Sequence, residues 1–187
     1  LGIMIDENIV TRYDEGPEIV YGIGLNQHPV ASYYRNMVIH FFVNKAIIEL
    51  ALLKASEKSG EDALQAFWAE VDHLRDLFKF EFFFRPKPEF WASVLAQTNH
   101  RYPGWSSGTV SLQKQLAQKP PRFGHAILRS LAEAYRIIAV TLVSLEGSPV
   151  GERKQLIATL LGHGREMHLR RHISSASALS RDLFSTG

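Results

Sequence analysis

The chain has 187 residues, of which 45% are hydrophobic and 21% charged, and its formal net charge is +2. This length and balance predict one globular domain, or one large fragment, that can bury a substantial core. The absence of cysteine excludes disulfide bonds and thiolate metal sites. The sequence has no signal-peptide pattern and no charge-free apolar stretch of about 18 residues, so no transmembrane helix is predicted. Because it opens on Leu1 and stops at Gly187, we expect a piece of a longer protein.

Two short stretches near the start, Ile9–Tyr13 and Ile19–Ile23, alternate apolar and polar residues around the turn-forming segment Asp14–Pro17. This pattern predicts a β-hairpin. A hairpin next to helices also occurs as the wing of a winged-helix DNA-binding domain. No recognition helix precedes this hairpin and its strands carry few cations, so we expect no nucleic-acid partner.

The apolar run from Met37 to Leu53 is the segment around which the rest of the chain is predicted to pack. On a helical wheel its apolar residues surround the axis and are broken only by four polar side chains, His40, Asn44, Lys45 and Glu49. Such a helix lies in a membrane or in the middle of a core, and the two charges argue against the membrane. Lys45 and Glu49 are four positions apart, so we expect them to form an ion pair.

Two later segments have apolar residues every three or four positions, which predicts amphipathic helices. The first begins at Glu61, continues through the phenylalanine-rich Phe80–Phe84 and ends at the prolines of Arg85–Pro88; the second spans Gly124–Leu145. The phenylalanines of Phe80–Phe84 are interpreted as a helix end buried in the core. The alternative is a phenylalanine-rich wall that faces an acyl chain or another domain.

The predicted fold class is mostly α, a multi-helix bundle around a central buried helix with a small N-terminal β-hairpin. We expect a single helical region over residues 1–187, with hairpin and linker in 1–30, a first helical part in 31–98, a loop-rich part in 99–123 and a second helical part in 124–187. The remaining predicted segments are a short helix in Pro88–Leu95, a loop in Asn99–Gly108, a strand or helix in Thr109–Gln118, a helix in Pro149–Leu161, a break at Gly162 and Gly164, and a last segment to Phe184 that Ser174 or Ser175 caps.

The basic surplus of the chain lies in its last fifth. Residues 151–187 contain six Lys or Arg and three Asp or Glu. Residues 1–150 contain fifteen Lys or Arg and sixteen Asp or Glu. The simpler interpretation is a solvated helix face. The alternative is that Arg165, Arg170 and Arg171 contact anionic lipid headgroups or a phosphate-bearing ligand.

Three histidines, His163, His168 and His172, raise the question of a metal site, because the last two are one helical turn apart. No third ligand follows at helical spacing, and the adjacent Arg170 and Arg171 would repel a cation. We expect neither a metal nor a cofactor. The sequence also contains no Gly-x-Gly-x-x-Gly, phosphate-loop or Gly-x-Ser-x-Gly motif.

Three segments carry a resemblance to a known family. They are Ser32-Tyr-Tyr-Arg-Asn followed by His40 and Phe42-Val43, then Leu74-Arg-Asp-Leu-Phe-Lys-Phe-Glu-Phe-Phe-Phe84, and His125-Ala-Ile-Leu-Arg129 with Glu133-Ala-Tyr-Arg136. In this order they resemble glycerol-3-phosphate acyltransferases of the large bacterial and mitochondrial type, from about Ile9 to Phe184. Dihydroxyacetone-phosphate acyltransferases share a related first segment. In that family these segments follow the acyltransferase domain.

The resemblance implies a transferase of which this chain is a non-catalytic part. Family enzymes use a His-x-x-x-x-Asp motif, in which histidine takes the proton of the attacking hydroxyl. None of the eight histidines here has Asp five positions later, and the family's Phe-Pro-Glu-Gly-Thr block is absent. We expect the full enzyme to use acyl-CoA or acyl carrier protein, and this region to pack on the catalytic acyltransferase domain of the same protein. The implied location is peripheral, at the cytoplasmic face of the cell membrane.

One group of residues is singled out as a candidate substrate or interface site: Tyr34, Arg35, Asn36 and His40. Arg35 and Asn36 are suited to a polar site at an interdomain face. The simpler interpretation is capping and hydrogen bonding around a buried helix. A different protein class also stays open, a free-standing all-α interaction or effector-binding module of a regulator.

Overall fold

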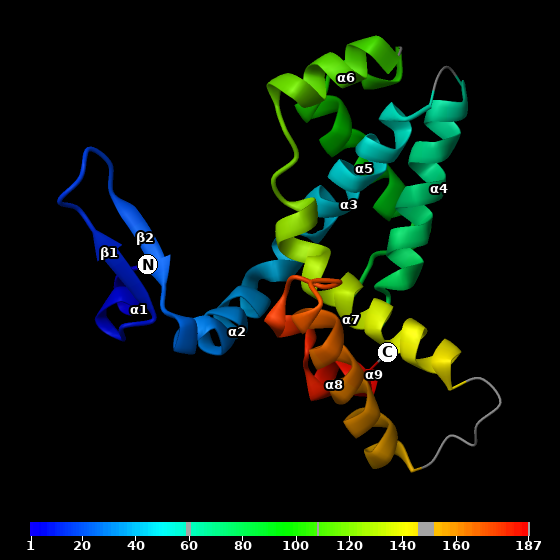
Figure 1. Cartoon of the computed structure of the whole chain (residues 1–187). Helices are drawn as coiled ribbons and strands as arrows, with labels where there is room; N and C mark the ends of the chain where they lie inside the picture. The colour runs from blue at the N-terminus through cyan, green and yellow to red at the C-terminus, as the bar shows by residue number, and fades with distance from the viewer. Residues whose placement is uncertain (59–60, 108, 146–151, 187) are drawn as a thin grey trace. The chain divides into compact units, whose positions relative to one another are not determined.

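The computed structural model describes residues 1–58, 61–107, 109–145 and 152–186. It is mostly helical with one small antiparallel sheet near the N-terminus, as predicted (Figure 1). The chain divides into two compact units, an N-terminal unit of Leu1–His40 and a helical unit of Phe41–Gly187. Among the described residues, no helix is both long enough and apolar enough to span a membrane.

The N-terminal unit contains the predicted hairpin. Strand β1 (Val10–Tyr13) pairs antiparallel with β2 (Val20–Ile23), and the register places Val10 opposite Ile23. The short helix α1 (Gly2–Asp6) precedes the hairpin, and helix α2 (His28–Val38) follows it. Helix α2 begins at His28, and its N-cap residue Gln27 makes no side-chain cap hydrogen bond.

The predicted continuous helix over Met37–Leu53 is wrong at its start. Helix α2 ends at Val38, a 3₁₀ turn occupies Ile39–Phe41, and helix α3 then runs over Val43–Ser56. The interruption falls where β-branched, aromatic and imidazole side chains follow one another from Val38 to Val43. Each of these has a lower helix propensity than Ala or Leu, and their run offers no strong helix former.

The helical unit is built around α3, which is the central buried helix. Helices α4 (Glu61–Leu77), α5 (Lys87–Arg101), α6 (Thr109–Gln118) and α7 (Gly124–Ser144) all contact it. The faces of α3 that meet them are apolar, and its buried residues are Val43, Ala46, Ile47, Ile48, Glu49, Ala51, Leu52 and Ala55. The main core is therefore assembled around this helix, with Phe67, Phe78, Phe90 and Leu128 from its neighbours.

Two predicted boundaries change in this unit, and one open alternative is resolved. Helix α4 ends at Leu77 rather than within Phe80–Phe84, where the chain forms turns. Helix α5 continues through Arg101, so most of the predicted loop after Asn99 is helical or 3₁₀. The segment Thr109–Gln118, predicted as strand or helix, is helix α6.

A second, smaller core lies where helices α8 (Arg153–Leu169) and α9 (Arg181–Thr186) pack on the carboxyl-terminal half of α7 (Figure 1). It contains Ala134, Ile137, Leu160, Met167, Ile173, Ala178 and Phe184. The predicted helix start at Pro149 lies outside the described residues. The predicted break at Gly162 and Gly164 is wrong, since α8 runs through both glycines.

Gly164 is needed because the chain packs closely there. A Cβ atom at Gly164 would lie 2.6 Å from Cδ2 of Leu179 and 3.1 Å from Cδ1 of Ile137, whereas a Cβ at Gly162 would meet nothing within 4 Å. The two glycines were interpreted as a helix break, but Gly164 instead allows close packing of α8 against its neighbours.

Candidate functional site

The first candidate group from the sequence lies on α2 and the 3₁₀ turn after it. The Tyr34 hydroxyl donates a hydrogen bond to Oε2 of Glu7, at 3.2 Å. The negative charge of Glu7, together with this hydrogen bond, raises the pKa of Tyr34. Arg35 is partly buried, and burial lowers its pKa. His40 is exposed, and the side chain of Asn36 is not described. Tyr34 thus holds α2 against the helical turn that contains Glu7.

The second candidate group lies at the carboxyl-terminal end of α8. Arg170 forms an exposed ion pair with Glu166, with Nη2 and Oε1 2.7 Å apart, and Arg165 is exposed. Arg171 has a left-handed backbone, with φ of 59°. Its N–H bonds to the carbonyl of His168 and the next N–H bonds to that of Met167, which is a Schellman ending. Arg171 therefore has a structural role in ending α8.

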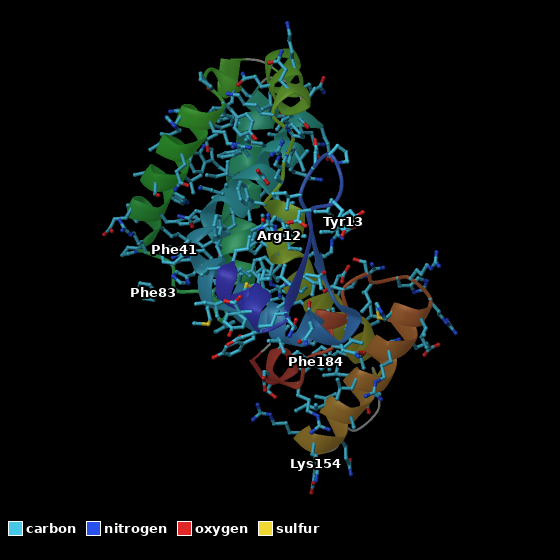
Figure 2. The ribbon with its side chains drawn as sticks, turned by 90° about the vertical axis from the view of Figure 1, so that its left-hand side faces the viewer. Arg12, Tyr13, Phe41, Phe83, Lys154 and Phe184 are labelled. Atoms are coloured by element: carbon cyan, nitrogen blue, oxygen red, sulfur yellow. The ribbon has the colours of Figure 1, made fainter. Side chains whose placement is uncertain are left out.

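The phenylalanines after α4 divide into two sets. Phe82 and Phe84 pack against the main core, and the Arg75 guanidinium lies 5.7 Å from the centroid of the Phe84 ring. Phe80 and Phe83 are 72% and 97% exposed, and the Phe83 ring extends away from the ribbon in Figure 2. The predicted buried cluster is wrong for these two residues. Helix α4 stops at Leu77, and the turns that follow it leave these two rings in solvent.

The three histidines of α8 and its end have different surroundings, and Nδ1 of His168 is buried without a hydrogen-bond partner among the described residues. Nδ1 of His163 lies 2.8 Å from Oγ1 of the buried Thr141, which joins α8 to α7. The backbone carbonyl of His172 accepts a hydrogen bond from Arg136. No group of three or more His, Asp or Glu suited to a metal occurs among the residues that the structure describes.

A site that the sequence did not indicate lies between α3 and the start of α7. Glu49 is 1% exposed, and its Oε2 atom accepts hydrogen bonds from the backbone N–H groups of Arg122, Phe123 and Gly124 at 2.9, 2.6 and 2.9 Å. The first N–H groups of a helix have no partner within the helix, and its N-terminal end favours negative charge. Glu49 thus caps α7 from another helix.

Basic side chains surround this carboxylate. Nη2 of Arg101 lies 3.8 Å from Oε1 of Glu49, and Nζ of Lys119 donates a hydrogen bond to the backbone carbonyl of Arg101 at 3.1 Å. Nζ of Lys45 lies 5.6 Å from the ring centroids of both Phe42 and Phe123, where it makes cation–π contacts.

The predicted Lys45–Glu49 ion pair is therefore wrong. Both groups are on α3, but the carboxylate is directed to the backbone of α7 and the ammonium to two aromatic rings. Three backbone donors hold the carboxylate more firmly than one flexible lysine, because each hydrogen bond to an ionised group contributes about 1.5–3 kcal/mol. The residues that determine this geometry are more than 70 positions away in sequence, so helical spacing alone gave no signal for them.

These side chains line a pocket of about 430 Å³ in the helical unit. Its lining residues are Lys45, Ile48, Glu49, Gln97, His100, Arg101, Lys119 and Phe123. Three of these are Lys or Arg, and one is a buried carboxylate. Oε1 of Glu49 has no hydrogen-bond partner in the described structure. The arrangement can hold an anion next to a hydrogen-bond donor.

Comparisons with known proteins agree with the resemblance seen in the sequence. A family model described as the glycerol-3-phosphate acyltransferase C-terminal region matches residues 1–187. Proteins provisionally named acyltransferase plsB1, from Mycobacterium bovis and from two strains of Mycobacterium tuberculosis, are each 34% identical over 189 aligned residues. The alignment covers 98% of this chain and 30% of each relative, so the chain spans less than a third of their length.

No solved structure gives a significant match to the chain. The family model covers every residue, and the relatives agree with it over almost the whole length. The resemblance carried by the three sequence segments is confirmed. The chain belongs to the family of glycerol-3-phosphate acyltransferase C-terminal regions.

Proposed function

We propose that this chain is a non-catalytic helical region of a glycerol-3-phosphate 1-O-acyltransferase and packs on the catalytic acyltransferase domain of the same protein. The whole enzyme would transfer an acyl group from acyl-CoA or acyl carrier protein to the sn-1 hydroxyl, a step of phospholipid biosynthesis. The observation that carries the proposal is the family match over residues 1–187 in a sequence without any His-x-x-x-x-Asp motif.

The chemistry of acyl transfer supports a non-catalytic role. Proton removal from the attacking hydroxyl needs a base within hydrogen-bond reach, and in the family motif an aspartate orients the histidine. His163 is partly buried, and its Nδ1 is already hydrogen-bonded to a threonine hydroxyl rather than to a carboxylate. Glu49 is a carboxylate in a pocket, but its Oε2 atom is held by three backbone N–H groups. These three donors fix Oε2 against the start of α7, so this oxygen is not free to approach a substrate hydroxyl.

Exposed apolar side chains support packing against another part of the protein. Phe80 and Phe83 lie in the turns after α4 and are largely exposed to solvent in this chain. Leaving two aromatic rings uncovered forgoes the hydrophobic stabilisation that their burial would provide. The curated relatives extend well beyond the 30% that this chain matches, so the rest of such a protein can supply the cover.

The experiment compares the isolated chain with the parent protein. Given glycerol 3-phosphate and acyl-CoA, the isolated chain should release CoA no faster than buffer, while the parent protein should turn over. Replacing Phe80 and Phe83 together by serine in the parent should lower both turnover and thermal stability. The matched control is Leu169→Ser, which alters an equally exposed apolar residue at the end of α8. Acyl transfer by the isolated chain, or a control as harmful as the double variant, would contradict the proposal.

We also propose that the protein associates peripherally with the cytoplasmic face of the cell membrane. The support is the basic surplus after Gly151, where Arg165 and Arg170 are exposed. Near an anionic surface each such cation contributes about 1 kcal/mol, and salt weakens the attraction. Arg171 is kept unchanged in the variants below, because it ends α8 in a left-handed backbone conformation.

The membrane test is cosedimentation with vesicles of anionic or neutral lipid. Binding to anionic vesicles should fall with salt and with the double change Arg165→Gln and Arg170→Gln. Lys114→Gln, which removes one charge from an exposed position on α6, is the control. Equal binding to neutral vesicles would indicate that Phe80 and Phe83 make the contact. Binding to neither kind of vesicle would refute membrane association.

A further inference from the structure

We propose that the pocket between α3, α5 and the start of α7 binds a small dicarboxylate that also carries a hydroxyl group. Such a ligand is neither the acceptor nor the donor of the proposed acyl transfer, so the proposal does not depend on that function. Helix α3 supplies Lys45 and Glu49, α5 supplies Arg101, and the residue after α6 is Lys119. The pocket volume of about 430 Å³ is within the range of small-ligand sites, roughly 300–1,000 Å³.

The formal charges of the lining favour a ligand with two negative charges. Lys45, Arg101 and Lys119 are three cations at neutral pH, and Glu49 is the single acidic residue of the lining, which leaves an excess of two positive charges. Oε2 of Glu49 is already held by the backbone N–H groups of residues 122–124. A concave site with one sign of charge in excess attracts an oppositely charged ligand more strongly than a flat surface does.

The cations form two groups rather than one. Lys45 lies one helical turn before Glu49 on α3, a rise of about 5.4 Å, and its Nζ is 5.6 Å from the centroids of two aromatic rings. The second group contains Arg101, whose Nη2 is 3.8 Å from Oε1 of Glu49, and Lys119, whose Nζ donates to the Arg101 carbonyl at 3.1 Å. A compact anion fits one group, whereas two carboxylates at the ends of a short carbon chain can contact both.

Donor groups remain available in both groups of cations. Lys45 makes no hydrogen bond among the described residues, and Lys119 uses one of its three N–H donors. Arg101 is held in place, because its Nε donates to the Tyr102 hydroxyl at 3.1 Å, and that hydroxyl donates to the Lys119 carbonyl at 3.2 Å. Its terminal N–H groups keep capacity for a carboxylate, which guanidinium binds in a bidentate manner.

Glu49 adds a second, independent indication. Its Oε1 atom is buried and has no hydrogen-bond partner in the described structure, which is unfavourable for a carboxylate oxygen. A donor on the ligand, between its two carboxylates, would satisfy Oε1. We assign this donor to a hydroxyl group because an ammonium group at the same place would lie beside the cations of the lining and be repelled by them.

The experiment measures binding to this 187-residue chain by calorimetry and by thermal shift, with four probes that differ in one group each. Malate has two carboxylates and a hydroxyl group; succinate lacks the hydroxyl, aspartate has an ammonium group in its place, and lactate lacks the second carboxylate. We expect malate to bind most tightly and the other three at least about tenfold more weakly, the factor that corresponds to about 1.4 kcal/mol. Binding of malate should weaken with salt.

Variants test the named residues. Lys45→Gln and Lys119→Gln change exposed side chains in the two different groups of cations, and each should weaken malate and succinate about tenfold. Lys114→Gln removes the same charge from an exposed position on α6 outside the pocket and should leave both affinities unchanged. Glu49→Gln should remove the preference for malate over succinate. Should Glu49→Gln unfold, that preference, measured on the unchanged chain, still tests the role of the hydroxyl group.

Three outcomes would overturn the proposal. The first is no binding of malate, and the second is equal affinity for malate and succinate, which would leave Oε1 of Glu49 without a role. The third is tighter binding of glycerol 3-phosphate than of malate to the same pocket, measured by competition, which would assign the pocket to a phosphomonoester. None of these outcomes bears on whether the isolated chain catalyses acyl transfer, so the two proposals fail independently.

Discussion

Oε2 of Glu49 lies 2.6 Å from the backbone nitrogen of Phe123, although 74 positions separate the two residues. The same oxygen also accepts the N–H groups on either side, so one carboxylate on α3 satisfies three donors at the start of α7. Gly124 permits this approach, because a Cβ there would lie 3.0 Å from Leu50 and 3.3 Å from the carbonyl of Ala46. The central helix α3 and helix α7 are thus joined by a buried polar contact.

Glu49→Ala should lower the free energy of unfolding by about 2–3 kcal/mol, because it leaves the N–H groups at the start of α7 without an acceptor. Urea denaturation measures the change. Glu57→Ala is the control, since Glu57 ends the same helix and forms an exposed ion pair with Lys54. It should cost less than about 0.5 kcal/mol. Equal effects of the two substitutions would show that the cap contributes nothing.

Phe78→Ala should lower the free energy of unfolding by about 3–5 kcal/mol, the range for removing a buried aromatic ring. Phe78 is 1% exposed and stacks on Tyr135 of α7, with ring centroids 5.8 Å apart. The matched substitution Phe83→Ala removes a ring five residues later that is almost fully exposed, and should have little effect. The denaturation midpoints of the two variants should differ clearly; an unchanged midpoint in Phe78→Ala would contradict the packing described here.

The two glycines of α8 should respond to alanine in opposite directions. Gly162→Ala should stabilise the chain by about 1 kcal/mol, since the position is open and alanine favours a helix. Gly164→Ala should destabilise it by about 1 kcal/mol, because overpacking against Leu179 and Ile137 exceeds the same gain in propensity. Thermal or urea denaturation compares them directly. A stabilising Gly164→Ala would mean that Leu179 moves aside without cost.

Glu133 should make stability depend on acid pH. Its carboxylate accepts hydrogen bonds from the backbone N–H groups of Ser174 and Ser175 and from the Ser174 hydroxyl. Partial burial raises the pKa of Glu133, but these hydrogen bonds outweigh it, so the pKa lies below its ordinary value. A lowered folded-state pKa contributes stability above the ordinary glutamate pKa, and this contribution is lost as pH falls through the folded-state value.

Glu133→Gln should therefore be less stable than the unchanged chain at neutral pH, and the difference should shrink toward acid pH. Urea denaturation at a series of pH values measures it. The control is Glu166→Gln, which alters a carboxylate in an exposed ion pair with Arg170. Its effect should stay below about 0.5 kcal/mol. A difference between Glu133→Gln and the unchanged chain that did not vary with pH would contradict a lowered pKa.

Elements with strong local patterns were predicted well. The alternating residues around Asp14–Pro17 became the hairpin β1–β2, and the three-to-four spacing from Glu61 and from Gly124 became α4 and α7. These signals lie within one element, where side chains a few positions apart share a face. The prolines of Arg85–Pro88 also marked a true boundary, although α4 ends before them.

Predictions failed where the outcome depended on distant neighbours. The spacing of Lys45 and Glu49 indicated a pair within one helix, but α7 offered backbone donors that bind the carboxylate better. Ser174 or Ser175 was predicted to cap the last segment. Ser175 is the N-cap residue of the 3₁₀ turn Ala176–Ala178 but makes no side-chain cap hydrogen bond. The backbone N–H groups of both serines bond to Glu133 on α7, 41 and 42 positions earlier, which the sequence did not indicate.

The sequence by itself determined the mostly helical class, the hairpin and the family, because propensity, periodicity and ordered segments are local properties of the chain. Only the tertiary structure decided which charges meet. It brought Arg101 next to Glu49 and Lys119 next to Arg101, exposed Phe80 and Phe83 while covering Phe82 and Phe84, and used Gly164 for packing. The physical reason is that hydrogen bonds and burial depend on distances in space. Those distances are fixed when helices more than forty positions apart in sequence pack against one another.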